Sequence, residues 1–134
     1  MILTQLELYQ VRNLVEAKLT PSTGLNLVYG ANASGKTSLL EAIHILSTSR
    51  SFRTLHIQHI IKQECDFLRV MGKVASTTNN KAFNIGIERD REKTQMRLSG
   101  ESVNNASKLA SILPVQIINP DVHKLLEQGP KYRR

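Results

Sequence analysis

The chain has 134 residues, of which 40% are hydrophobic, and its 18 Lys and Arg residues against 11 Asp and Glu residues give a formal charge of +7. This length predicts one domain or less, and the basic balance suits a polyanionic partner such as a nucleic acid or a nucleotide. The single Cys65 excludes an internal disulfide framework, and the lack of a secretory signal pattern or of an apolar run near about 18 residues predicts a cytoplasmic protein without a membrane span.

The first part of the chain predicts a β-hairpin. Apolar and polar residues alternate within residues 2–11, which is typical of a half-buried strand. Arg12-Asn13 predicts a turn, and a second alternation over residues 16–20 completes the antiparallel pair. A further turn covers residues 21–24. The run 25–29 is more continuously apolar, which predicts a central strand covered on both faces.

A helix is predicted to begin near Gly35 and to end near residues 47–49, from apolar residues at helical spacing: Leu39, Leu40, Ile43 and Leu46. Residues 55–61 predict a short helix or turn.

The remaining elements are shorter. An antiparallel meander is predicted from three alternating segments joined by polar turns: residues 67–74, 83–88 and 94–98. Residues 105–113 predict a short helix that Pro114 stops, and residues 115–118 predict a buried strand. Another helix is expected to start at residues 122–127 and to stop at Gly129-Pro130.

The strongest motif lies between the strand at residues 25–29 and the first helix. It fits G-x-x-x-x-G-K-[ST], the phosphate-binding loop, with the residues Gly30, Ala31, Asn32, Ala33, Ser34, Gly35, Lys36 and Thr37. Glycines let backbone N–H groups approach phosphates, and the helix N-terminus adds further donors. Lys36 is predicted to reach the β- and γ-phosphates, and the Thr37 hydroxyl to ligate Mg²⁺. The alternative, a glycine-rich turn before an ordinary helix, leaves a lysine in the first helical turn unexplained.

Hydrolysis needs a second acidic residue for Mg²⁺ and a base for the attacking water. The nearest approach is Ile117-Ile118-Asn119-Pro120-Asp121, in which Asn and Pro interrupt the required apolar strand. The sequence therefore predicts nucleotide binding without a complete catalytic set, and we assign no catalytic residue. Two other classes stay open: a nucleotide kinase or small GTPase, and a DNA-binding module with a vestigial nucleotide site.

The order of the elements, with a hairpin before the phosphate loop and a meander after its helix, resembles the SMC-like ABC-type ATPases. Within that class the chain is similar to the RecF family of bacterial DNA replication and repair proteins. The similarity is carried by five segments: residues 8–13, 26–43, 50–53, 119–121 and 129–134. It implies an α/β P-loop fold of the ABC-type ATPase lobe, with hairpin and meander around the phosphate-loop strand and helix. Residues 1–134 would form the N-terminal part of the head domain, without its downstream motifs.

The resemblance also implies a function. Members of the family bind ATP with Mg²⁺, dimerise around it, hydrolyse it slowly and bind single-stranded and gapped DNA. They act with RecO and RecR in recombinational repair and the SOS response. In ABC-type ATPases a second subunit completes the catalytic site.

One loop position departs from the family, which usually has glycine where this chain has Ala33. A positive φ there would cost alanine about 1–2 kcal/mol, whereas a negative φ would make the change nearly neutral. Asp121 and Gln116 are the nearby candidates for a water-orienting residue.

Four further groups have open roles. Arg12-Asn13 would approach the nucleotide or form a plain turn. Arg50 and Arg53 would contact DNA or a partner subunit, or lie in a solvated loop with Phe52 in the core. A basic cluster would track a DNA backbone or pair with interleaved acids: Arg89, Arg91, Lys93 and Arg97. His56 and His59 share a spacing that suits metal ligands but lack matching partners.

Overall fold

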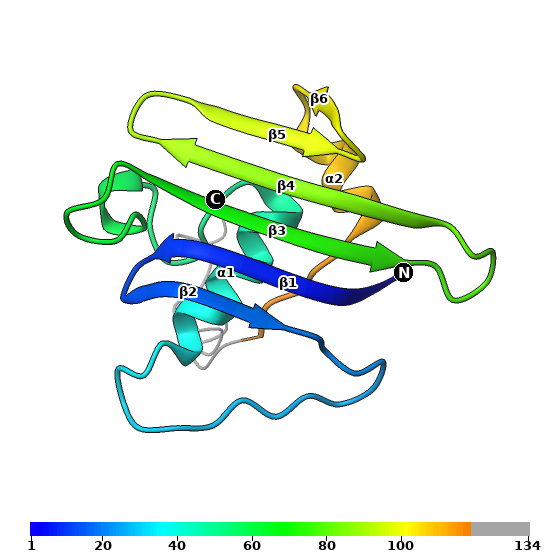
Figure 1. Ribbon diagram of the computed structural model, residues 1–134, viewed down its shortest axis with the longest axis horizontal. Coiled ribbons are helices and arrows are strands. Elements are labelled where there is room, and N and C mark those ends of the chain that lie inside the picture. Colours follow the sequence, from blue (N-terminus) through cyan, green and yellow to red (C-terminus); the bar gives the residue numbers. More distant parts are fainter. Residues whose placement is uncertain (119–134) are drawn as a thin grey trace, which may run out of the picture.

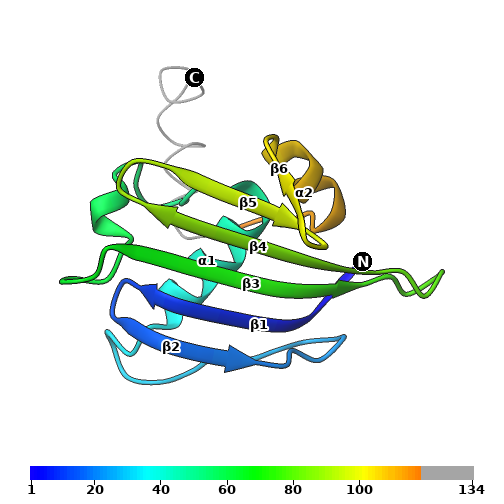
Figure 2. The same ribbon diagram turned by 45° about the horizontal axis from the view of Figure 1, so that its top comes forward.

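In the computed structural model, which describes residues 1–118, an antiparallel sheet of six strands carries two helices on one face (Figure 1). The strand order is β2-β1-β3-β4-β5-β6. Turning the molecule shows both helices behind the same face of the sheet (Figure 2). No helix within these residues is long and apolar enough to cross a membrane.

The predicted hairpin is confirmed. β1 (Ile2–Val11) and β2 (Leu14–Leu19) pair antiparallel, and Val11 lies opposite Leu14, which leaves Arg12 and Asn13 as the turn. The alternation in β1 predicts a strand with one buried face, and Leu6 and Leu8 on that face are buried.

The meander is also confirmed and is one strand longer than expected. It comprises β3 (Phe67–Ala75), β4 (Ala82–Asp90), β5 (Thr94–Leu98) and the short β6 (Glu101–Val103). The extra hairpin turns at Ser99 and Gly100, whose φ angles of 49° and 92° are both positive, as a type I′ turn requires. β1 pairs with β3, with Leu6 opposite Gly72, which joins hairpin and meander into one sheet.

The helices α1 (Lys36–Thr48) and α2 (Ala106–Ile112) form the second layer. α1 ends where expected, because Ser49 turns left-handed at a φ of 58° and donates its N–H to the Ile45 carbonyl at 2.7 Å. The Ser47 hydroxyl donates to the Leu113 carbonyl at 2.6 Å and so ties α1 to the end of α2. The core between the layers is built from buried aliphatic side chains, among them Leu8, Leu39, Ala42, Ile45, Leu46, Leu68, Val70, Ile85, Ile87 and Leu109.

Two predicted strands are wrong. Residues 25–29 and 115–118 form no strand. By contrast, the short helix or turn predicted at residues 55–61 is confirmed as η1 (Ile57–His59). A strand needs a neighbour for its backbone N–H and C=O groups, and neither run pairs with any strand of residues 1–118. Instead of being covered on both faces, Leu25 and Tyr29 are 95% and 85% exposed.

Some expectations lie outside the described residues. These are the helix at residues 122–127, its stop at Gly129-Pro130, and the segments 119–121 and 129–134.

Candidate functional site

The loop of residues 30–37 runs from the extended segment into α1, and its shape depends on two left-handed residues. Ala33 has a φ of 62° and Gly35 a φ of 98°. Glycine is favoured at 35 because other residues are strained at this φ, and a Cβ there would also lie 2.5 Å from Cδ2 of Leu14, which would have to shift. At Ala33 the angle is positive, so the cost of about 1–2 kcal/mol for alanine applies.

The start of α1 is suited to an anion. The helix begins at Lys36, its N-cap Gly35 supplies no side-chain acceptor, and its first turn contains no acidic residue. The backbone N–H groups of a first helical turn have no partner within the helix, and they carry the positive end of the helix dipole. A phosphate supplies the oxygens and the negative charge that such a terminus stabilises.

Lys36 and Thr37 follow directly. The Lys36 ammonium folds back over the loop and donates to the carbonyls of Gly30 at 2.7 Å and Ala31 at 2.6 Å. Thr37 is exposed at the start of the helix. A cation and a hydroxyl therefore stand beside the loop donors, and the residues present fit a polyphosphate with a hard cation bound to it.

A buried carboxylate lies behind the loop. Glu41, on α1, accepts hydrogen bonds from Nε and Nη2 of Arg12, both at 2.7 Å, and its side chain has 0% exposure. Nη1 of Arg53 lies 3.7 Å from the same carboxylate, and the Ser51 hydroxyl donates to it. Burial favours a higher pKa for Glu41, but the hydrogen bonds from Arg12 and Ser51 and the two arginine charges outweigh it. The pKa of Glu41 therefore lies below its ordinary value.

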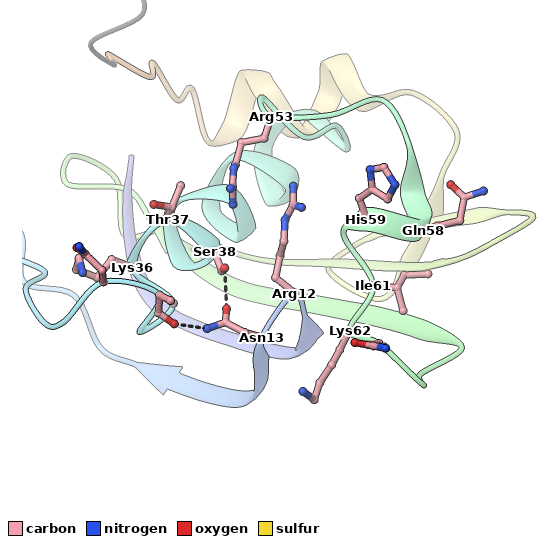
Figure 3. A pocket seen from close by; sticks show the side chains of 14 residues that line it. Arg12, Asn13, Lys36, Thr37, Ser38, Arg53, Gln58, His59, Ile61 and Lys62 are labelled. Atoms are coloured by element: carbon pink, nitrogen blue, oxygen red, sulfur yellow. Dashed lines mark hydrogen bonds between the residues drawn. The ribbon is translucent and has the colours of Figure 1, made fainter.

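The turn between β1 and β2 also holds the loop directly. Nδ2 of Asn13 donates to the Ala33 carbonyl at 2.8 Å, and Oδ1 of Asn13 accepts from the Ser38 hydroxyl at 3.0 Å (Figure 3). The turn is thus part of the site.

The opposite wall of the site is η1 and the segment after it. Its backbone is fixed to the end of β1, because the Arg12 N–H donates to the Ile60 carbonyl at 2.7 Å and the Lys62 N–H to the Gln10 carbonyl at 2.8 Å. Between this wall and the loop lies a pocket of about 870 Å³. Among the described residues its lining includes four cationic side chains and no carboxylate: Arg12, Lys36, Arg53 and Lys62.

The pocket brings together five of the eight predicted loop residues: Asn32, Ala33, Gly35, Lys36 and Thr37. Arg12 and Asn13 also line it, which favours an approach to the nucleotide over a plain turn. Arg53 lines it too, a position that neither of the roles predicted for it included. Sequence reasoning missed Glu41, Ser38 and Lys62. Glu41 lies inside segment 26–43, one of the segments that carry the family resemblance. The available signal was an acidic residue between the apolar Leu40 and Ala42 in the predicted helix.

Most of the other singled-out residues lie outside the pocket, although His59 lines it. Phe52 packs edge-on against His44 with ring centroids 5.5 Å apart, and Arg50 contributes its carbonyl to His44 Nδ1 at 2.8 Å. Within the basic cluster, Arg89 donates to the Ser49 carbonyl at 3.3 Å, and the neighbouring Glu88 pairs with Arg69 instead of with a member of the cluster. The rings of His56 and His59 lie tilted to one another with centroids 5.6 Å apart. Residues 1–118 contain no group of three His, Cys, Asp or Glu residues that could hold a metal.

Comparison with known proteins agrees with this geometry. The family model described as RecF/RecN/SMC N terminal domain matches residues 2–123. The DNA replication and repair protein RecF of Thioalkalivibrio sulfidiphilus is 43% identical over 134 residues, which is all of this chain and 37% of that protein. RecF of Pseudomonas aeruginosa (strain LESB58) is 45% identical over 135 residues, all of this chain and 36% of that protein. The chain thus spans just over a third of the length of these curated relatives.

Solved structures agree as well. The recombination mediator protein RecF-ATP of the RecFOR pathway superposes with a TM-score of 0.83 at 26% identity, over 96% of this chain and 36% of that one. A structure from work on ATP-driven dimerization and DNA-stimulated activation of SMC ATPases gives a TM-score of 0.81 at 17% identity, over 97% of this chain and 93% of that one. At that identity the likeness concerns the fold alone. The expected ABC-type ATPase fold is thereby confirmed.

Proposed function

Because this chain belongs to the RecF/RecN/SMC N-terminal domain family, we propose that residues 1–134 are the ATP-binding N-terminal part of the head domain of a DNA replication and repair ATPase. The observation that carries this proposal is the loop of residues 30–37. It leads into a helix N-terminus without a side-chain acceptor and without a first-turn acid, beside Lys36. The solved RecF-ATP structure supports ATP as the nucleotide.

Each part of the loop has a role in this proposal. The loop residues bind the phosphates: Gly30, Ala31, Asn32, Ala33, Ser34, Gly35, Lys36 and Thr37. Lys36 exchanges its two carbonyl partners for the phosphate oxygens, which are stronger acceptors because they are charged. The Thr37 hydroxyl is a ligand for Mg²⁺, and bound Mg²⁺ neutralises phosphate charge.

The cations around the pocket support the choice of a polyphosphate. The Glu41 carboxylate compensates the charge of Arg12 at close range. Arg53 lies 3.7 Å from this carboxylate and its side chain is 42% exposed. Lys62 adds a positive charge on the opposite wall. An anionic ligand in the pocket would meet positive charge from both sides.

The whole protein is proposed to do more than this part. It is a weak ATPase that forms an ATP-dependent homodimer, in which the second copy and the rest of the chain supply the missing catalytic groups. It binds single-stranded and gapped DNA, acts in the cytoplasm with RecO and RecR, and supports recombinational repair and the SOS response. The basic charge of +7 supports the binding of DNA, and the other roles follow from membership of the family.

The test is the thermal stability of the protein with and without millimolar Mg-ATP. A ligand that binds the folded state raises the melting temperature, and Lys36→Ala should abolish the rise. Lys108→Ala, an exposed lysine on α2, is the matched control and should keep the full rise. Thr37→Ala should weaken binding in Mg²⁺ more than in EDTA.

Two results would redirect the proposal. Equal stabilisation by GTP and ATP with phosphoryl transfer to a small acceptor would favour a kinase or GTPase. A melting temperature indifferent to Mg-ATP, together with salt-dependent DNA binding, would favour a DNA-binding module with a vestigial loop.

A further inference from the structure

We infer that Asn13 is the positioning residue that holds the phosphate loop in its binding conformation, an inference that rests on the proposed nucleotide site. Its side chain lies between Ala33 in the loop and Ser38 in α1 (Figure 3). The orientation of the amide is fixed by chemistry. The Ala33 carbonyl can only accept, so the Asn13 nitrogen must face it and the oxygen must face the Ser38 hydroxyl.

The loop needs this support at Ala33 in particular. At a φ of 62° the alanine is left-handed, a conformation that L-residues other than glycine rarely adopt. If Ala33 relaxed to a negative φ, its carbonyl would turn away from Asn13 and the next N–H, that of Ser34, would turn with it. That N–H donates to the Ala31 carbonyl at 3.3 Å and so helps to hold the turn of the loop. The hydrogen bond at 2.8 Å therefore acts on the residue where the loop is strained.

The other partner makes Asn13 a firm support. Ser38 is 5% exposed and lies in α1, so its hydroxyl approaches Asn13 from a fixed position. The neighbours of Asn13 contact the same unit, since Leu14 packs against Gly35 and Arg12 bonds to Glu41. Three consecutive residues, the two of the turn and Leu14 at the start of β2, thus contact the loop and its helix. Among these three, only Asn13 bonds to the strained residue.

The inference is tested by combining Asn13→Ala with Ala33→Gly and measuring the Kd of Mg-ATP by calorimetry on the intact protein. If the loop loses its competent conformation, the apparent Kd rises in proportion. Asn13→Ala alone should weaken binding about 5- to 30-fold, the factor that corresponds to the left-handed cost of alanine. Glycine adopts this conformation readily, so in the Ala33→Gly background the same change should cost less than about 3-fold. An equal loss in both backgrounds would overturn the inference.

Two further variants separate the hydrogen bonds. Asn13→Asp keeps the shape and the acceptor for Ser38 but removes the donor to Ala33, so it should be as harmful as Asn13→Ala. Ser38→Ala keeps that donor and should cost less. The reverse order would overturn the inference.

A readout without nucleotide separates this inference from the proposed function. The NMR backbone chemical shifts of Ala33 report whether it is left-handed. They should move towards negative-φ values in Asn13→Ala and stay in place in Asn104→Ala, an exposed asparagine away from the loop. Shifts that stay left-handed in Asn13→Ala would refute the role of Asn13. Mg-ATP that fails to bind the unaltered protein would instead refute the nucleotide site.

Discussion

Arg12 and Glu41 are joined by two hydrogen bonds of 2.7 Å that connect the β1–β2 turn to the middle of α1. The Glu41 side chain is fully buried and Arg12 is 18% exposed. Removing one partner of a buried pair leaves an uncompensated charge. We expect Glu41→Gln to lower the free energy of unfolding by about 3 kcal/mol, measured by urea denaturation at neutral pH.

The matched control is Glu88→Gln. Glu88 pairs with Arg69 on the sheet surface, where the two side chains are 38% and 44% exposed. Exposed pairs contribute about 0–1 kcal/mol, so this change should be nearly silent. If both variants lost the same stability, burial would not distinguish the two pairs.

The same carboxylate predicts a pH dependence. The pKa of Glu41 is lower in the folded protein than its ordinary value, so folding favours the charged form. The stabilisation is complete above the ordinary pKa of a glutamate, about 4.3, and is lost as the pH falls through the lower folded pKa. The slope of unfolding free energy against pH below about pH 4 should therefore be smaller in Glu41→Gln. An unchanged slope would mean that Glu41 does not titrate below its ordinary range.

Local patterns in the sequence predicted the elements whose partners are near in the chain. The β1–β2 hairpin, the β3–β5 meander and α1 carry their own periodicity and turns, and all form. Residues 25–29 failed because a continuously apolar run identifies burial without identifying what covers it. No strand of residues 1–118 pairs with this run, so its backbone is left out of the sheet.

In the candidate site, too, the sequence predicted the local features and missed the contacts between residues that are distant in the chain. Its loop is a contiguous motif, so the sequence alone identified it. The sequence also raised the question of whether φ is positive at Ala33. The Arg12–Glu41 pair spans 29 residues and the Asn13–Ala33 bond spans 20, so only the fold brings them together. Arg12 and Asn13 were noticed as a possible turn, but nothing in the sequence indicated that Glu41 would be the partner of Arg12.

Gly72 allows α1 to approach the sheet closely. A Cβ at Gly72 would lie 2.4 Å from Cδ2 of Leu46 and 3.0 Å from Cδ1 of Leu3. Gly72→Ala should therefore overpack the core and destabilise the fold by about 1–3 kcal/mol, measured by chemical denaturation. Gly86→Ala is the control on the adjacent strand, because a Cβ there would meet only Cβ of Arg97 at 4.0 Å. It should change stability by no more than about 0.5 kcal/mol, and an equal loss at both glycines would argue against the close contact.

The apolar segment before the phosphate loop predicts self-association of the 134-residue chain. Leu25, Leu27 and Tyr29 are 95%, 80% and 85% exposed, although they lie in one short extended run. A contiguous apolar surface of this kind favours contact with another apolar surface. Because burying a leucine contributes about 1.5–3 kcal/mol, the double change Leu25→Asn and Leu27→Asn should weaken association at least about tenfold in sedimentation equilibrium. Val15→Asn on β2, a position that is 64% exposed, should have a smaller effect. Light scattering from a clean monomer at high concentration of the unaltered chain would contradict the prediction, because the exposed run would then have no tendency to be covered.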